Sequence, residues 1–134
     1  MIALTPVVSG VGEDGPVSSP FDLEEGGKLQ IRAATDVART TVRMLAAGVA
    51  TVDVQALISR DTGAVTFVDM TEARVLSSPP SPLDMATAVG FVTEMMILIP
   101  ESSKGEASGT MLEELRMLDN RGVPLSKELC DLLR

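Results

Sequence analysis

Three glycines near the start of the chain have the spacing of a phosphate-binding loop. Gly10, Gly12 and Gly15 lie in the stretch Gly-Val-Gly-Glu-Asp-Gly-Pro-Val, which matches the pattern G-x-G-x-x-G-x-V. Because glycine has no side chain to block a ligand, backbone N–H groups at this spacing can approach phosphate oxygens closely. Pro16 argues against the helix that a dinucleotide-binding turn needs next. The alternative is an ordinary Gly/Asp/Pro-rich loop, since its two acidic residues would repel phosphate.

Two aspartates flank the strongest strand signal in the sequence. Strand-forming residues dominate 54–59 and 64–70, and the four residues between them end in glycine. This pattern predicts a β-hairpin over residues 54–70. Asp53 precedes its first strand, and Asp69 lies near the end of its second strand.

This arrangement resembles the catalytic segment of the protein-kinase-like fold, in which a hairpin follows the catalytic Asp and ends in a magnesium-binding Asp. The resemblance covers about residues 33–99, with the glycine loop ahead of it. It implies that Asp53 orients the acceptor hydroxyl. It also implies that Asp69 holds Mg²⁺, with Gln55 as the nearest amide ligand. The loop Gly10–Gly15 would then cover the phosphates of ATP, and Lys28 would contact them.

The sequence departs from the kinase pattern at several fixed positions. Thr51 and Val52 replace the His and Arg of H-R-D, and Ile58 stands where the family has Asn. Met70 and Thr71 replace the Phe and Gly of D-F-G. We therefore expect a minimal or degenerate kinase-like domain, or a pseudokinase, that acts on a protein partner. The alternative for the two aspartates is that they cap a loop and end a strand without a metal.

Composition removes several classes of function. The 134 residues include no His, Trp or Tyr and one Cys, and the net charge is −8. Without His, catalytic triads with an imidazole base are excluded, and a lone Cys cannot form a zinc cluster. We therefore expect neither zinc nor haem. The acidic charge argues against binding nucleic acid or anionic lipid.

A non-enzymatic alternative stays open. An acidic protein of this size could be an adaptor, an inhibitor or a secretion-chaperone-like module for a basic protein partner. The N-terminus has no basic region before its apolar run, and Pro6 interrupts that run, so a cytoplasmic protein is expected. Export of an effector by a machine that reads the N-terminus stays possible.

The elements that must position these residues indicate an α+β fold in one domain, 1–134. Helices are predicted over 35–47, 83–98, 111–120 and 126–133, and residues 101–109 read as a polar loop. The helix over 83–98 is apolar almost all round, so we expect it to be buried at the centre. Residues 1–27 are rich in turn formers and are expected to include a flexible N-terminal segment. Within the 83–98 helix, Glu94 is expected to lie at an edge or to pair with an Arg such as Arg43 or Arg74; the alternative is a functional acid.

Overall fold

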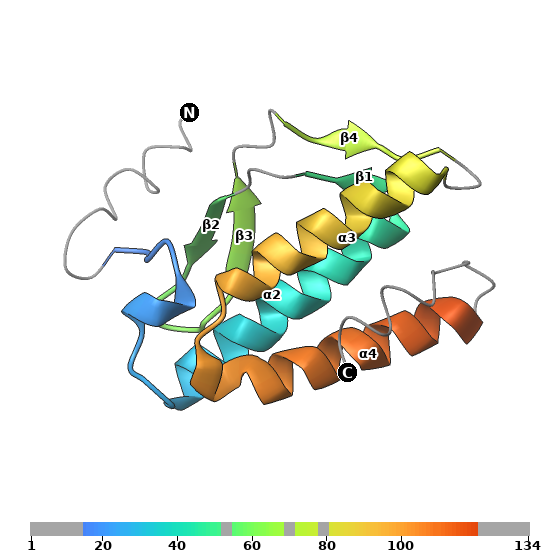
Figure 1. Cartoon of the computed structure of the whole chain (residues 1–134). Coiled ribbons are helices and arrows are strands. Elements are labelled where there is room, and N and C mark those ends of the chain that lie inside the picture. Colours follow the sequence, from blue (N-terminus) through green and yellow to red (C-terminus); the bar gives the residue numbers. More distant parts are fainter. Residues whose placement is uncertain (1–14, 52–54, 69–71, 78–80, 121–134) are drawn as a thin grey trace.

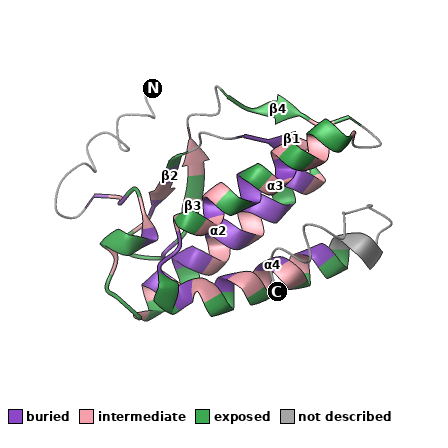
Figure 2. Cartoon of the chain, in the orientation of Figure 1, coloured by how far each residue is buried: buried purple, intermediate pink, exposed green. Residues whose placement is uncertain are grey.

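One long helix organises the structure. The computed structural model describes residues 15–51, 55–68, 72–77 and 81–120, and these form an α+β fold (Figure 1). The helix α2, Lys28–Ala46, runs through the middle of the view, with α3 and α4 beside it and the strands at one side. Figure 2 shows buried residues along much of α2. Its buried residues are Gln30, Ala33, Ala34, Val37, Ala38, Thr41, Val42 and Leu45.

The helix α2 begins seven residues before the predicted start at Thr35. Its N-cap is Gly27, which makes no side-chain capping bond. Packing compensates for the missing cap, because Ala33 and Ala34 are fully buried and need a helical backbone to reach the core. The side chain of Thr35 turns back to the carbonyl of Arg32 within the helix, and so it caps nothing.

The predicted hairpin is confirmed. The strands β2, Gln55–Ile58, and β3, Val65–Val68, pair antiparallel, with Gln55 opposite Val68 and Ile58 opposite Val65. Gly63 ends the turn at φ +74°, a left-handed conformation that favours glycine. A Cβ atom at this position would also lie 3.1 Å from the carbonyl oxygen of Leu29. The turn therefore packs closely on the first turns of α2.

A second small sheet lies beyond the open end of the hairpin. The strands β1, Val49–Ala50, and β4, Arg74–Val75, pair antiparallel, with Ala50 opposite Arg74. Gly48, at φ +79°, links α2 to β1, and its carbonyl accepts a bond from the backbone N–H of Leu76 at 2.7 Å. The four strands therefore form two separate two-stranded sheets, β1 with β4 and β2 with β3.

Part of the N-terminal segment is packed into the fold. Val17 forms an antiparallel bridge with Ile58 on the outer edge of β2, with backbone bonds of 2.9 and 2.8 Å. Val17 is 5% exposed and joins a small apolar cluster with Ala33, Ala56 and Ile58. A short 3-10 helix, η1, Pro20–Asp22, follows and leads to α2. Residues 15–27 are thus held by the hairpin and by α2, while residues 1–14 lie outside the described residues.

The helix α3, Pro82–Ile97, has the predicted position but lies to one side of the centre. Ser81 caps it in a capping box with Asp84. Ala88, Phe91, Val92 and Met95 are buried, whereas Leu83 is 68% exposed and Ile97 is 67% exposed. The described residues therefore bury one side of α3, and the central helix is α2.

The predicted loop over 101–109 is wrong, because this segment is helical. A 3-10 turn, η2, Glu101–Ser103, leads directly into α4, Lys104–Asn120. Ala107, Met111 and Leu115 are buried at intervals of four residues in the core that α2 also lines. This packing stabilises a helix through a stretch whose Ser and Gly residues favour a loop. The predicted helix over 126–133, which contains Cys130, lies outside the described residues.

Candidate functional site

The predicted site residues divide into those that the structure describes and those that it does not. Gly10, Gly12, Asp53 and Asp69 lie outside the described residues. Gly15, Lys28 and Gln55 lie within them, and their positions test whether one site could contain all three.

Gln55 lies at the open end of the hairpin, next to the small sheet. It is exposed and is the register partner of Val68. Two short segments join the hairpin to the small sheet: residues 51–54 lead from β1 to β2, and residues 69–73 lead from β3 to β4. Because β1 pairs with β4 and β2 pairs with β3, both segments start and finish on neighbouring strands. These are the two segments that carry Asp53 and Asp69 in the sequence.

Gly15 and Lys28 lie at the other end of the hairpin. The carbonyl of Gly15 accepts a bond from Arg60 Nε at 2.6 Å, and Arg60 is in the hairpin turn. Lys28 is the exposed first residue of α2, next to Leu29, which contacts the same turn. A strand rises about 3.3 Å per residue, so Gln55 lies about 13 Å from the start of the turn. A Mg²⁺ ion at Gln55 would therefore be too far away to contact phosphates held by Lys28. The structure does not bring Gly15, Lys28 and Gln55 together in one site.

Arg74 is a basic residue at the open end that the sequence reasoning did not assign to the site. It lies on β4 opposite Ala50, is exposed, and makes no ion pair with another described residue. The signal that could have identified it is its position five residues after Asp69, at the start of the strand that pairs with β1.

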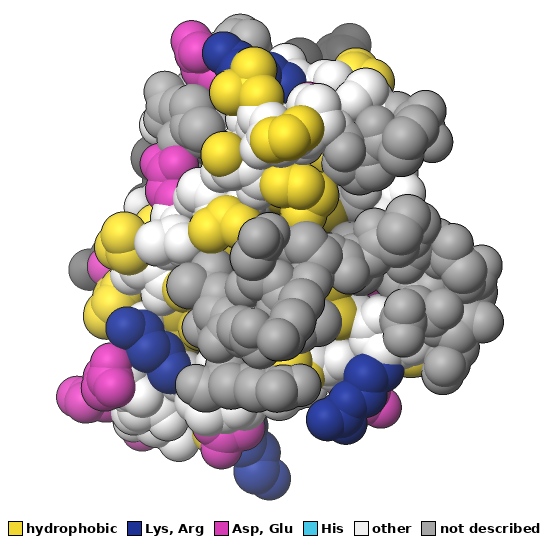
Figure 3. All heavy atoms as spheres, turned by 45° about the vertical axis from the view of Figure 1, so that its right-hand side comes forward, with side chains coloured by type: hydrophobic (Ala, Val, Ile, Leu, Met, Phe, Trp, Pro, Cys, Tyr) yellow, Lys and Arg dark blue, Asp and Glu magenta, His cyan; other side chains and the backbone are white. Residues whose placement is uncertain are grey.

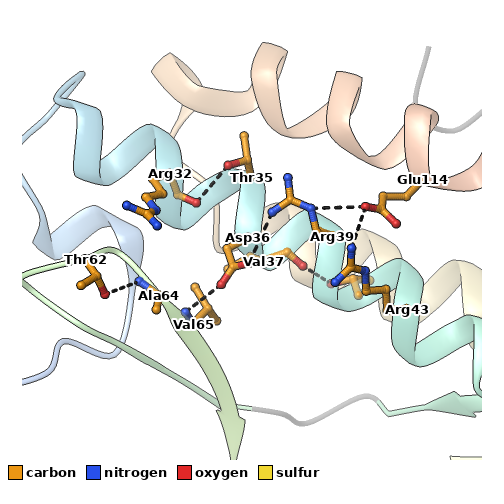
Figure 4. Close-up of polar contacts among 11 residues, drawn as sticks. Arg32, Thr35, Asp36, Val37, Arg39, Arg43, Thr62, Ala64, Val65 and Glu114 are labelled. Carbon is orange, nitrogen blue, oxygen red and sulfur yellow. Dashed lines mark hydrogen bonds and ion pairs between the residues drawn. The ribbon is translucent and has the colours of Figure 1, made fainter.

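Four charged residues on α2 and α4 pair with one another: Asp36, Arg39, Arg43 and Glu114. Glu114 Oε1 lies 3.2 Å from Arg39 Nε and 3.4 Å from Arg43 Nη2, and its side chain is 13% exposed (Figure 4). Asp36 Oδ2 accepts a 2.8 Å bond from the backbone N–H of Val65 and so ties β3 to α2 (Figure 4). This cluster therefore joins α2 to α4 and to β3, which is a structural role.

Of the options considered for Glu94, pairing with Arg43 is wrong, because Arg43 pairs with Glu114. Nor does Glu94 form an ion pair with Arg74, or with any other residue in the described ranges. The reason is geometric: α4 approaches the Arg43 side of α2 and supplies the carboxylate, whereas Glu94 lies half-buried on α3.

Asp84 has a strongly perturbed acidity with a structural cause. Its carboxylate accepts bonds from the Ser77 hydroxyl, from the backbone N–H of Ser81 at 3.1 Å and from the backbone N–H of Ser77 at 2.9 Å. These donors stabilise the charged form and lower the pKa of Asp84 from 3.8 to about 2. The carboxylate thereby fastens the residues after β4 to the start of α3.

An apolar groove lies between α2, β1 and β3. It has a volume of about 490 Å³. Its lining residues are Thr40, Met44, Ala47, Val49, Val65, Thr66 and Phe67. Since none of them is charged, the groove suits an apolar group and not a triphosphate.

Over the described ranges, no three His, Cys, Asp or Glu side chains gather closely enough to hold a metal ion. No single helix in the same part of the chain is long and apolar enough to cross a bilayer. Pro82–Ile97 and Glu101–Met117 together meet that criterion by length and composition, but the chain bends by 111° between them.

Comparison with protein-family models, with curated proteins and with solved structures found no match to this chain.

Proposed function

We propose that this chain is a degenerate kinase-like domain that binds ATP with Mg²⁺ at the open end of its hairpin. The observation that carries the proposal is the pairing of β1 with β4 and of β2 with β3. Because of this pairing, the segments 51–54 and 69–73, which carry Asp53 and Asp69 in the sequence, start on neighbouring strands and end on neighbouring strands. In the protein-kinase-like fold the catalytic Asp and the magnesium-binding Asp occupy the corresponding positions around the hairpin.

The proposed roles follow from the chemistry of the side chains. Carboxylate and amide oxygens are donors that suit Mg²⁺, so Asp69, with Gln55, would hold the ion. Asp53 would orient an acceptor hydroxyl. Arg74 would contact the phosphates in place of Lys28, which lies at the turn end. Bound Mg²⁺ would neutralise charge on the phosphates of ATP.

Slow or absent phosphotransfer is expected from the missing residues. Thr51 and Val52 stand in place of the family's His and Arg, and no described lysine or arginine other than Arg74 lies on β1, β2, β3 or β4. Electrostatic stabilisation contributes much of the catalysis in phosphoryl transfer, so one exposed cation would give a weak centre. The proposed role is therefore nucleotide-dependent binding of a protein partner.

The test is the melting temperature with and without ATP and Mg²⁺. A ligand at 100 times its dissociation constant stabilises a fold by about 2.7 kcal/mol. The shift should need Mg²⁺ and should disappear in Asp69→Ala. Asp61→Ala is the matched control, since it removes an exposed acid at the turn end of the same hairpin.

A second pair of variants separates the two candidate cations. Arg74→Ala should reduce the ATP shift, and Lys28→Ala should leave it unchanged. The opposite result would contradict the placement of the nucleotide at the open end. No shift at millimolar ATP would contradict the nucleotide proposal as a whole.

A protein-interaction module is the second candidate, and the apolar groove favours it. The groove can receive an apolar side chain of a partner, and the net charge of −8 would attract a basic one. If ATP has no effect, Met44→Asp, which places a charge in the groove, should abolish binding to a purified partner. Met117→Asp, at an exposed position on α4, is its control.

A further inference from the structure

The outer edge of β3 has no partner strand in the described part of the chain. Each small sheet has two strands, and β3 pairs only with β2. The outer edge of β2 is covered, because Val17 forms a bridge with Ile58 there. The strand β4 is two residues long and is exposed at both positions. A strand edge with free backbone groups is a template for pairing with another strand, and β3 offers the longer free edge.

The hydrogen bonds of the hairpin show which backbone groups point outward from β3. The N–H of Ser59 donates to the carbonyl of Ala64, and bonded pairs alternate with non-bonded pairs along antiparallel strands. Val65 and Phe67 are therefore in non-bonded pairs, and their N–H and C=O groups point away from β2. Asp36 accepts the outward N–H of Val65 (Figure 4). The N–H and C=O of Phe67 have no backbone partner among the described residues.

The apolar groove lies directly beside this free edge. Val65 and Phe67 line it from β3, and Thr40, Met44 and Ala47 line it from α2. Val65 and Phe67 are half-buried against both apolar clusters, so their side chains lie on the face of the hairpin that packs on α2. A strand added to β3 would place alternate side chains on that same face. One of these side chains would therefore enter the groove.

The strand β3 and the helix α2 run in the same direction beside the groove. Gly63 packs against Leu29, and two residues later Val65 bonds to Asp36. Two strand residues rise about 6.6 Å, and four helix residues rise about 6 Å. Phe67 therefore lies level with about residue 40 of α2, where Thr40 also lines the groove.

We propose that a second copy of this chain pairs with β3 about a two-fold axis beside Phe67. The two β3 strands would run antiparallel, and each Phe67 would exchange both of its outward backbone bonds with Phe67 of the second copy. The two hairpins would form one four-stranded sheet, with the two aromatic rings side by side at the grooves. Closed two-fold dimers are the commonest symmetric assemblies. The proposal does not depend on the nucleotide site, and a different partner in the groove would have to displace the second copy.

The charges on α2 complement one another under this symmetry. Asp36, Thr40 and Arg43 lie on one stripe of the helix, at spacings of four and three residues. An axis near Thr40 would place Asp36 of one copy level with Arg43 of the second copy, and the reverse. The side chain of Arg43 is 65% exposed, and its only described ion pair is with Glu114, whose carboxylate also binds a second arginine (Figure 4). Arg43 therefore has donors left for a carboxylate of the second copy.

The strand β4 provides the control surface. Hydrophobic side chains gather in the upper part of the face seen in Figure 3. Val75 on β4 is the most exposed large hydrophobic residue that the structure describes, at 86%. If a second copy bound the β4 edge and not the β3 edge, Val75→Asp would weaken the dimer. This variant makes the same charge change as Met44→Asp, which places a carboxylate in the groove.

Sedimentation equilibrium in about 0.15 M salt measures the association, because charges more than about 8 Å apart are then largely screened. The net charge of −8 on each copy therefore does not keep the copies apart. We expect the mean mass to rise from 14.1 kDa toward twice that value between micromolar and millimolar protein. Met44→Asp and Arg43→Glu should each raise the dimer Kd at least tenfold. Val75→Asp and Arg116→Glu, which make the same charge changes at exposed positions away from the groove, should leave the Kd within twofold.

A thiol cross-link provides a second readout that adds no charge to the groove. In a chain that carries Cys130→Ser and Thr40→Cys, a short bis-maleimide should link two copies across the axis. The control carries Cys130→Ser and Asp61→Cys, whose thiol lies in the exposed hairpin turn. We expect at least tenfold more linked dimer from Thr40→Cys than from Asp61→Cys. Circular dichroism of dilute samples shows whether each variant keeps the fold.

Three outcomes would overturn the proposal. The first is a monomer at every concentration. The second is a dimer that Val75→Asp weakens and that Met44→Asp and Arg43→Glu do not, because the interface would then lie at β4. The third is equal linkage at Thr40→Cys and Asp61→Cys. The association is measured without nucleotide, so its failure and the failure of the ATP proposal are distinguishable.

Discussion

Replacing one buried glutamine should loosen three segments at once. Gln30, the third residue of α2, is 2% exposed. Its Oε1 accepts bonds from the backbone N–H of Gly26 at 2.8 Å and from the hydroxyls of Ser102 and Ser103 at 3.2 and 3.3 Å. Its Nε2 donates to the carbonyl of Pro20 at 3.3 Å. One side chain therefore joins η1, the start of α2 and η2.

The change Gln30→Leu keeps a similar volume and removes all four bonds. A typical hydrogen bond contributes about 0.5–1.5 kcal/mol net, and a buried group left without a partner costs about 1–3 kcal/mol. Three of the four bonds are long, so their contributions lie toward the low end. We expect the free energy of unfolding to fall by about 2–4 kcal/mol. Ser103→Ala, which removes one long bond, should cost about 1 kcal/mol or less.

Urea unfolding at equilibrium measures both changes. At this chain length each kcal/mol should lower the melting temperature by roughly 3–5 °C. Amide exchange gives a local readout, because the backbone N–H of Gly26 loses its acceptor in Gln30→Leu and should exchange faster. A loss below about 0.5 kcal/mol, the scatter of ordinary surface substitutions, with unchanged exchange at Gly26 would refute the conclusion that Gln30 joins these segments.

Two further predictions concern the turns and the pH dependence of stability. The pKa of Asp84 is lowered to about 2, so the stability it contributes is present above its unfolded value near pH 4 and is lost as the pH falls toward 2. Ser77→Ala should raise that pKa toward 3.8 and reduce this loss, which acid unfolding curves and carboxyl NMR titration can measure; an unaltered titration would contradict the assigned cause. Gly63→Ala should destabilise the protein by about 2–3 kcal/mol, since left-handed backbone costs about 1–2 kcal/mol and the new Cβ would press on the Leu29 carbonyl. Gly26 has a similar φ of +69°, but a Cβ atom there would lie in open space, so Gly26→Ala should cost only the free energy of the left-handed backbone. Equal urea midpoints for the two variants would exclude a steric contribution at Gly63.

Local signals in the sequence predicted some elements well. The hairpin depends on two strand-forming runs and on the glycine at the end of the turn, and both are visible in the sequence. In the structure this glycine, Gly63, has a positive φ. The predicted start of the helix at residue 83 is one residue from the observed start of α3 at Pro82, which the capping box of Ser81 and Asp84 fixes within four residues. Such features need no knowledge of distant contacts.

The starts of α2 and α4 could not be predicted from local signals. Gly27 gives α2 no side-chain cap, and the helix is fixed instead by burial of Ala33 and Ala34 and by the bonds of Gln30. The predicted start at residue 111 is too late for α4, because Ala107 is already buried in the core that α2 lines. Tertiary contacts decided both boundaries.

The candidate site was predictable only in part. The sequence indicated that Asp53 and Asp69 border one hairpin, and the described strand pairs are compatible with that prediction. The placement of Lys28 could not be foreseen, because it depends on where α2 begins. Once α2 starts at Lys28 and its next residue contacts the hairpin turn, this lysine lies at the end away from Gln55.

The pairing of α2 with α4 has a consequence for the newly made chain. Arg43 and Glu114, which join these helices, are 71 residues apart in sequence. At synthesis rates of about 5–20 residues per second, α2 emerges roughly 4–14 s before the part of α4 that covers it. During that interval the α4-facing side of α2 has no partner, although α3 and the hairpin are made before α4. The hairpin itself can form within microseconds. A growing chain would therefore expose the α4-facing side of α2 to chaperones and to aggregation until α4 has been made.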